Sequence, residues 1–144
     1  MNSKGNSRWL FKTEPSTYSF EDLLRDKKTH WNGVRNFQAR NFLKEISEGD
    51  LALIYHSGEI RSVVGIARVI RKAYPDPDPK KSGDWVQVDI QAVRALEHPV
   101  SLSKIKATKA LKDILLVKQS RLSVMPLLPS HFELIIEMGK TGDR

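Results

Sequence analysis

Five stretches of the chain carry apolar residues in the patterns of β-strands. They are residues 8–13, 51–56, 62–73, 85–90 and 122–125. Residues 51–56 are apolar at nearly every position, which is typical of a strand buried on both faces, whereas residues 85–90 alternate and indicate a half-buried strand. Gly65, inside the third stretch, indicates a bulge or a close approach of another part of the chain.

Apolar residues at helical spacing predict helices elsewhere. One helix begins at Phe20, a second contains Phe37 and ends near Gly49, one or two short helices lie within residues 102–115, and the last spans 129–138. Ser19 is the expected N-cap of the first helix, because its hydroxyl can accept a backbone N–H that has no helical partner. The second helix is expected to direct Phe37, Leu43 and Ile46 into the core.

The order of these elements indicates the fold class. One strand and two helices come before three consecutive strands, and further helices, a strand and a helix complete the chain. Such a run of strands favours a mixed or antiparallel sheet curled into a small barrel over a stack of parallel βαβ units. The prolines of residues 75–79 cannot donate to a sheet, so this stretch is expected to be a stiff exposed loop.

A single domain is expected over residues 8–139. The length of 144 residues is enough for one compact domain with a substantial core, and no linker or repeat interrupts it. Residues 1–7 and 140–144 lack an apolar anchor, so both ends are expected to be flexible.

Composition and charge narrow the classes of function. The chain has 24 Lys and Arg against 17 Asp and Glu, a net charge of +7, which favours anionic partners and above all nucleic acid. A basic surface kept only for solubility is the alternative. The absence of cysteine excludes disulfides and cysteine-ligated metals. Because no apolar run is long enough to span a membrane and the N-terminus has no secretion signal, a cytoplasmic protein without a membrane partner is expected.

Common signatures of enzymes are absent from the sequence. It contains no Gly-rich phosphate loop, no His-Glu-x-x-His and no Gly-x-Ser-x-Gly. The histidines are His30, His56, His98 and His131, and no two of them have the spacing of ligands on one helix face. No catalytic residue, metal or cofactor is therefore expected.

The end of the first strand carries the polar cluster Lys12-Thr13-Glu14. Lys12 can meet a phosphate or a carbonyl, and Glu14 can accept a hydrogen bond from the amino group of a base. An ordinary solvated strand end is the alternative.

A second cluster combines Trp31, Arg35 and Asn36 with a glycine between them, and Arg40 follows. An aromatic plane, a guanidinium and an amide are the groups that stack a flipped base and read its edge. Core packing is the alternative for Trp31 alone.

Further candidates stand where strands are expected to end. Tyr55, His56 and Ser57 follow the most apolar strand, and a structural role for His56 is the alternative. A cation and a hydroxyl come from Arg121 and Ser123. Tyr74 and Trp85 flank the proline-rich loop, where they form either an aromatic cage or part of the core.

These clusters, in this order, resemble the EVE domain family. The matching strings include Trp9-Leu10-Phe11-Lys12-Thr13-Glu14-Pro15, Trp31-Asn32-Gly33-Val34-Arg35-Asn36, Tyr55-His56-Ser57, Ala73-Tyr74-Pro75-Asp76, Trp85-Val86-Gln87-Val88-Asp89 and Arg121-Leu122-Ser123-Val124-Met125-Pro126. Together they extend over nearly the whole chain between its two ends.

The resemblance implies an α+β fold, a PUA-like mixed β pseudobarrel with flanking helices, related to YTH and ASCH domains. It also implies a pocket for modified nucleobases at the mouth of the barrel. Carried over by position, the residues expected to line it are Lys12, Thr13, Glu14, Trp31, Val34, Arg35, Asn36, Tyr55, His56, Ser57, Tyr74, Pro75, Trp85, Arg121, Leu122 and Ser123. The segment 78–84 is shorter here than in many relatives, so how far it covers the pocket is open.

The function predicted from these observations is that of a monomeric, non-catalytic reader of a modified base in DNA or RNA. Trp31 and Trp85 would stack the base, Arg35 and Arg40 would hold phosphates, and Asn36, with Ser57 and the Glu14 region, would read the base edge. The alternatives are an ASCH-like amidohydrolase or nuclease that uses Lys12, Glu14 or His56, and a protein-interaction module. The base, the kind of nucleic acid and the pathway stay open.

Overall fold

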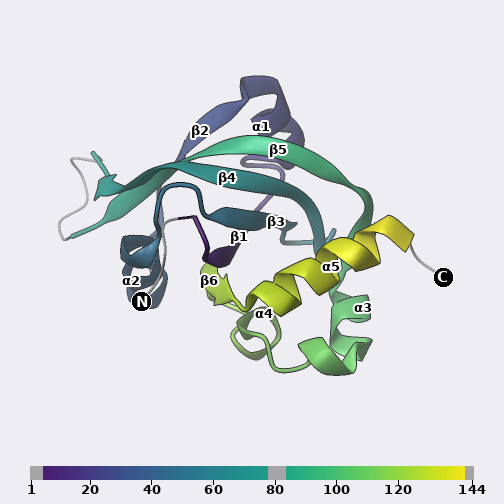
Figure 1. Cartoon of the computed structure of the whole chain (residues 1–144). Helices are drawn as coiled ribbons and strands as arrows, with labels where there is room; N and C mark the ends of the chain where they lie inside the picture. The colour runs from purple at the N-terminus through teal and green to yellow at the C-terminus, as the bar shows by residue number, and fades with distance from the viewer. Residues whose placement is uncertain (1–4, 78–83, 142–144) are drawn as a thin grey trace.

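The computed structural model describes residues 5–77 and 84–141 (Figure 1). In chain order the elements are β1 (Arg8–Thr13), α1 (Phe20–Asp26), β2 (Lys28–Trp31), α2 (Phe37–Glu45), β3 (Leu51–His56), β4 (Ser62–Pro75), β5 (Val86–Ser101), α3 (Leu102–Ala107), η1 (Lys109–Leu111), α4 (Leu115–Lys118), β6 (Val124–Leu127) and α5 (Pro129–Thr141). The strands form one sheet in the order β2-β5-β4-β3-β1-β6. Because β1 and β3 run parallel and the other neighbours run antiparallel, the mixed sheet with flanking helices is confirmed.

The sheet curls back on itself. In the sheet β5, β4 and β3 separate β2 from β1, yet the ring of Trp31 at the end of β2 lies 5.5 Å from the ring of Phe11 in β1, centroid to centroid. The described strands β2 and β6 are the two edges and do not pair with each other. The fold is therefore a barrel with an open seam, and the long strands β4 and β5 arch across it in Figure 1.

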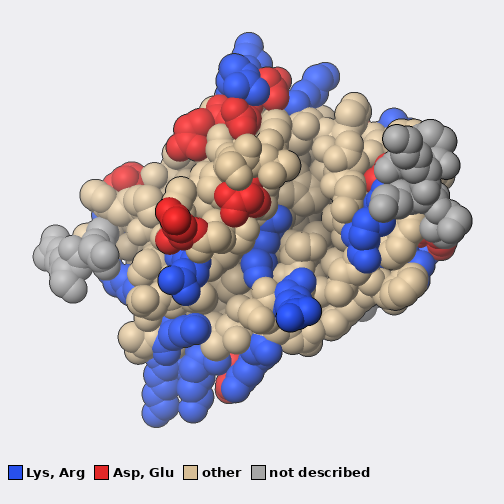
Figure 2. Space-filling model, turned by 180° about the vertical axis from the view of Figure 1, so that it is seen from behind, with Lys and Arg blue, Asp and Glu red and all other residues tan. Residues whose placement is uncertain are grey.

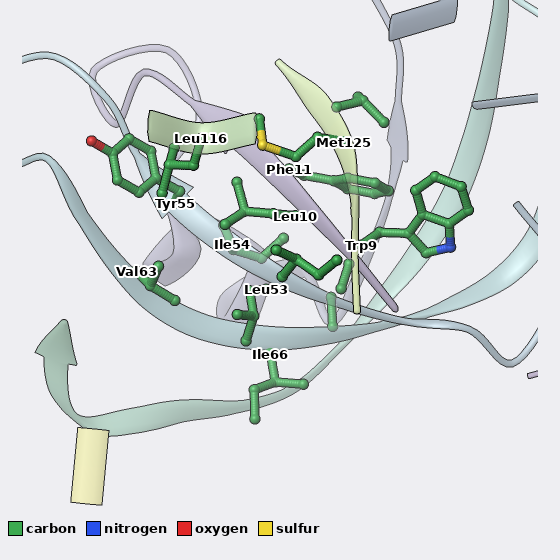
Figure 3. Packing of buried hydrophobic residues seen from close by; sticks show 14 of the residues in the cluster. Trp9, Leu10, Phe11, Leu53, Ile54, Tyr55, Val63, Ile66, Leu116 and Met125 are labelled. Atoms are coloured by element: carbon green, nitrogen blue, oxygen red, sulfur yellow. The ribbon is translucent and has the colours of Figure 1, made fainter. Parts of the chain in front are cut away.

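The core fills the inside of this curl. Leu10, Phe11, Leu53 and Ile54 are at most 1 % exposed, and Figure 3 shows their side chains packed between the strands together with Met125 of β6. Helix α5 packs against β5 and β1. The apolar run at residues 51–56 is thus a strand that is buried from its second residue onward, as its composition predicts.

Phe20, the first residue of α1, is held from two sides. Its backbone N–H donates to Nε2 of His56 over 2.9 Å. Its ring lies over Gly65, where an added Cβ would come within 2.4 Å of the ring atom Cζ. The close approach expected at Gly65 is confirmed, and the pairing register of β4 also shifts on both sides of this glycine.

The cap predicted at Ser19 is confirmed. Its hydroxyl accepts from the N–H of Asp22 over 3.0 Å, and the Asp22 carboxylate accepts from the N–H of Ser19 over 2.9 Å. This reciprocal capping box fixes where α1 begins, and so where the preceding loop must end.

Several strand boundaries differ from the sequence prediction. Strand β2 was not predicted, because its four residues are mostly polar and their extended conformation comes from pairing with β5. Strand β5 continues to Ser101, far beyond the predicted end at residue 90, and β6 begins two residues later than predicted. The proline-rich loop is described only in part, because residues 78–83 lie outside the described residues. How far the loop covers the pocket depends on these residues.

The inward orientation predicted for Phe37 is wrong. Its side chain is 66 % exposed, while Leu43 and Ile46 are buried as predicted. Residues 39, 43 and 46 follow the spacing of one helix face, and residue 37 falls on a different face of the same helix.

The described residues near the two ends make defined contacts, and the flexibility expected of the ends stays a prediction. The N–H of Ser7 donates to the Asp50 carboxylate over 3.3 Å, Arg8 binds the carbonyls of Gly5 and Ser7, and α5 extends to Thr141. Residues 1–4 and 142–144 lie outside the described residues. None of the described helices has both the length and the apolar character that crossing a membrane requires.

Gly65→Ala is expected to destabilise the fold by about 1–3 kcal/mol, because the new methyl group must displace the Phe20 ring or the strand. Urea denaturation followed by circular dichroism measures the change. The double variant Gly65→Ala with Phe20→Leu should be less destabilised than the sum of its single variants. Additive effects would show that the contact with Phe20 is not the cause.

The stability of the protein is expected to fall as the pH drops below about 6.5, because of His56. Burial, the largest influence, lowers the pKa of His56 below its ordinary value of about 6.5, although Glu21 and Glu14 act in the opposite direction. The unfolded chain therefore binds a proton more readily, and the stabilisation present above pH 6.5 is lost as the pH falls. Melting temperatures should decline less steeply in His56→Gln, whose amide oxygen can still accept from Phe20. Parallel profiles would contradict this assignment.

Candidate functional site

A pocket of about 530 Å³ opens where the sheet fails to close. Its lining comes from the end of β1, the loop before α1, the strand β2, the loop between β2 and α2, and one residue before β6. These lining residues are Lys12, Thr13, Glu14, Thr17, Tyr18, Thr29, His30, Trp31, Asn32, Gly33, Val34, Arg35, Asn36 and Ser123. The volume lies within the roughly 300–1,000 Å³ that small-molecule sites occupy.

Trp31 provides an aromatic wall that is also part of the core. Its side chain is 8 % exposed, and its ring packs on Phe11 at 5.5 Å and against the edge of Tyr18 at 6.4 Å. The Tyr18 hydroxyl donates to the Asp26 carboxylate over 2.9 Å, which fixes the second ring of this wall. Trp31 therefore belongs both to the core and to the pocket wall, and its stacking on a base stays a prediction.

The loop between β2 and α2 is anchored by Asp76. The carboxylate of Asp76 accepts from the N–H of Gly33 over 3.0 Å and from Nη1 of Arg35 over 3.1 Å, and the side chain of Asp76 is only 4 % exposed. Gly33 has a φ of +76°, a conformation that residues with a Cβ rarely adopt, so the turn itself requires a glycine. This anchoring fixes the guanidinium of Arg35 at the pocket wall.

Asn36 has a structural role and a group left for a ligand. Its Oδ1 caps α2 by accepting from the N–H of Ala39 over 2.8 Å. Since the oxygen is engaged, the amide NH₂ remains as a donor on the pocket surface. Nothing in the described part of the chain accepts a hydrogen bond from it.

The charged residues at the end of β1 are also held in place. Nζ of Lys12 donates to the carbonyl of Ser120 over 2.6 Å, and partial burial lowers the pKa of Lys12. The Glu14 carboxylate accepts from the N–H and the hydroxyl of Ser16 over 3.2 and 3.1 Å, and Thr13 donates to the carbonyl of Tyr18. Figure 2 shows the face on the far side of Figure 1, hollowed near its middle, with Lys and Arg around the hollow and Asp and Glu gathered at one side.

A smaller hollow of about 330 Å³ adjoins the pocket and shares Asn36 with it. Its other lining residues are Gln38, Lys118, Gln119, Ser120, Arg121 and Leu122. Of the predicted string Arg121-Leu122-Ser123, only Ser123 lines the main pocket, because the chain turns into β6 at this point. The expectation that Arg121 and Leu122 line the same pocket as Trp31 is therefore wrong.

The predicted lining by Tyr55, His56 and Ser57 is also wrong. Tyr55 and His56 are 2 % and 3 % exposed, and His56 accepts the Phe20 N–H, so the structural alternative for this histidine is correct. Ser57 lies outside the lining, and its N–H donates to the carbonyl of Thr13. Strand β3 is central in the sheet, so its last residues stay covered instead of emerging at the pocket mouth.

The pocket lining also does not include Tyr74, Pro75, Trp85 or Arg40, although Tyr74 contacts His30 and Trp85 contacts Arg35. Tyr74 donates to Asp89 and lies beside His30, with the Arg71 guanidinium 3.5 Å from its ring centre. Pro75 ends β4 on the surface. The Trp85 ring stacks on Phe37, and Arg40 lies over both rings, so these residues form a separate aromatic group.

Six lining residues were not among those expected to line the pocket: Thr17, Tyr18, Thr29, His30, Asn32 and Gly33. Thr29 and His30 belong to the unpredicted strand β2. Nδ1 of His30 lies 2.7 Å from the carboxylate of Asp89 in β5, and a prediction that paired residues 28–31 with β5 would have placed His30 opposite Asp89. Within the described residues, no three His, Asp or Glu side chains gather in a group that could hold a metal ion.

Comparisons with known proteins agree with this architecture. The sequence profile of the EVE domain matches residues 7–138. Human thymocyte nuclear protein 1 is 34 % identical, over 92 % of this chain and 74 % of that protein. A crystal structure of the human protein, THYN1, in complex with 5-methylcytosine-containing DNA superimposes with a TM-score of 0.86 at 33 % identity, covering 94 % of this chain and 98 % of the other.

Bacterial proteins share the fold too. An NMR structure of a Rhodopseudomonas palustris protein has a TM-score of 0.87 at 40 % identity and covers 96 % of both chains. ASCH from Zymomonas mobilis has a TM-score of 0.58 at 10 % identity, over 91 % of this chain and 94 % of the other, which is a likeness of fold alone. With its profile matched over nearly its whole length, this chain belongs to the EVE domain family.

Proposed function

We propose that this protein binds a modified nucleobase, turned out of a nucleic-acid strand, in the pocket at the open seam of the sheet. The convergence of an aromatic wall, a free amide donor and cations on one cavity of suitable size carries the proposal. Proteins that recognise extruded bases use this combination of stacking and edge reading.

Each group of the pocket has a role in this proposal. The base packs against Trp31, with Tyr18 beside it, and its polar edge faces the Asn36 amide. Lys12 lies in the pocket and Arg121 in the adjoining hollow. In this proposal, both side chains bind phosphates of the nucleic-acid strand. The role of Trp85 in stacking this base, predicted from the sequence, is not retained, because Trp85 lies outside the lining.

A relative supports the choice of ligand. Human THYN1 was crystallised with DNA that contains 5-methylcytosine. We therefore propose a methylated pyrimidine in DNA as the first ligand to test, with the same base in RNA as the comparison.

Non-catalytic binding is proposed in preference to catalysis. Of the residues considered as acid, base or nucleophile, His56 is buried and accepts the Phe20 N–H, and Glu14 is held by Ser16. The likeness to ASCH is one of fold alone and supplies no catalytic role. A product formed when the protein is incubated with the modified oligonucleotide would overturn this part of the proposal. The monomeric state and the cytoplasmic location stay predictions.

Calorimetric titration with oligonucleotides that contain one 5-methylcytosine or one cytosine tests the proposal. The methylated oligonucleotide is expected to bind more tightly by roughly 4-fold or more, because burying one methyl group contributes about 0.8 kcal/mol. Affinity should also fall as salt increases, since cations of the protein replace counterions of the strand. Equal affinities for the two bases in both DNA and RNA would refute a reader of this modification.

Asn36→Ser separates the two roles of this residue. The serine hydroxyl still caps α2, whereas the donor amide is lost from the pocket, so affinity should fall by roughly 2- to 13-fold with little change in stability. Asn6→Ser, at an exposed asparagine that lines neither hollow, is the matched control and should bind like the unaltered protein. Unchanged affinity in Asn36→Ser would remove this residue from base recognition.

A further inference from the structure

Phe37 exposes an aromatic ring beside the pocket. Every Phe, Tyr and Trp of the chain lies in the described residues, and of these side chains only that of Phe37 is exposed. It is the first residue of α2 and directly follows Asn36, which lines the pocket. A single exposed apolar residue is ordinary in itself, so its surroundings must decide whether it has a function.

The surroundings of Phe37 are aromatic and cationic. Its ring stacks on that of Trp85 with 5.1 Å between centroids and 24° between planes. The Arg40 guanidinium lies 5.1 Å from the Phe37 ring centre and 5.6 Å from that of Trp85, and the Arg35 guanidinium lies 5.4 Å from Trp85. We call Phe37, Trp85, Arg35 and Arg40 the Phe37 platform.

Neighbouring contacts hold the platform in place. The Trp85 carbonyl accepts from the N–H of Asp76 over 3.0 Å, and the carboxylate of Asp76 binds Arg35. Next to Trp85, Asp84 forms an ion pair with Lys44 of α2. A rigid aromatic surface loses little conformational freedom when a ligand stacks on it.

An aromatic plane between guanidinium groups is complementary to a nucleobase and its phosphate. Bases stack on aromatic rings regardless of sequence, and Arg contributes both charge and stacking. Because Arg35 belongs to the pocket and the platform alike, the two sites are continuous, and one strand can occupy both.

Turning a base out of its strand removes a stacking partner from each neighbour. We propose that the Phe37 platform stacks the nucleobase next to the one held in the pocket and so replaces the lost partner. This inference rests on the proposed function, and it assigns to the same strand a second contact that is indifferent to base modification.

A double-mutant cycle between protein and oligonucleotide tests the inference. The protein is either unaltered or carries Phe37→Ala. The oligonucleotide contains one 5-methylcytosine, and the nucleotide next to that base, on its 5′ or its 3′ side, is either intact or abasic. With the intact oligonucleotide, Phe37→Ala should weaken binding by roughly 5- to 150-fold. On one of the two sides, the abasic nucleotide should weaken binding to the unaltered protein by about as much as Phe37→Ala does. Binding to the Phe37→Ala variant should then change little when that same nucleotide is made abasic.

Two control variants accompany the cycle. Phe37→Tyr keeps the aromatic plane and should retain affinity, whereas Leu128→Ala, at another exposed apolar residue outside both hollows, should bind like the unaltered protein. Melting temperatures confirm that each variant is folded. If the two changes act independently at both sides, or if Phe37→Ala binds normally, the inference is wrong.

The same titrations keep the two proposals apart. The ratio of affinities for methylated and unmethylated oligonucleotides reports on the pocket, and Phe37→Ala should leave this ratio unchanged. A ratio of one in the unaltered protein refutes the reader, and the absence of coupling at both neighbours refutes the platform.

Discussion

The open seam between β2 and β6 is the constraint on which the site depends. Had these edges paired, the sheet would form a closed small barrel whose interior side chains fill, with no room for a ligand. The contact between Trp31 and Phe11 brings the ends of the sheet together without backbone pairing. Loops then occupy the gap, and polar groups that hydrogen bonds to neighbouring residues hold in place line the cavity. The pocket is thus a direct consequence of incomplete closure.

One short segment, residues 31–37, supplies much of the pocket and of the surface beside it. Trp31 forms the aromatic wall of the pocket, and Asn36 caps α2 while its amide NH₂ stays free in the pocket. Phe37 lies outside the pocket, on the protein surface. The conformation of this segment depends on Asp76, which binds Gly33 and Arg35. Asp76 directly follows β4, where the long hairpin of β4 and β5 turns. A buried carboxylate left without its cation would be strongly destabilising, so this anchor couples the shape of the pocket to the ends of β4 and β5.

The sequence predicts what local chemistry determines and fails where tertiary pairing decides. Ser19, Gly65 and the apolar strand at residues 51–56 have local signatures, and each prediction is confirmed. Strand β2 has none, because it is extended only by virtue of its partner β5. His56 looked like a pocket residue because it ends a strand, but its ring nitrogen is engaged by the N–H of Phe20, which no local pattern reveals.

The same reasoning explains why net charge alone was a weak guide to the site. Several cations are bound to acids, as Arg35 is to Asp76 and Arg25 to Asp22, so they add little to the long-range field. Between residues 102 and 121, however, six Lys and Arg accompany a single acid, Asp113. This segment ends at the smaller hollow beside the pocket. Lys118 and Arg121 of this segment line that hollow, so part of the charge that favours nucleic acid lies next to the cavity, while Ile105 and Leu111 of the same segment are buried in the core.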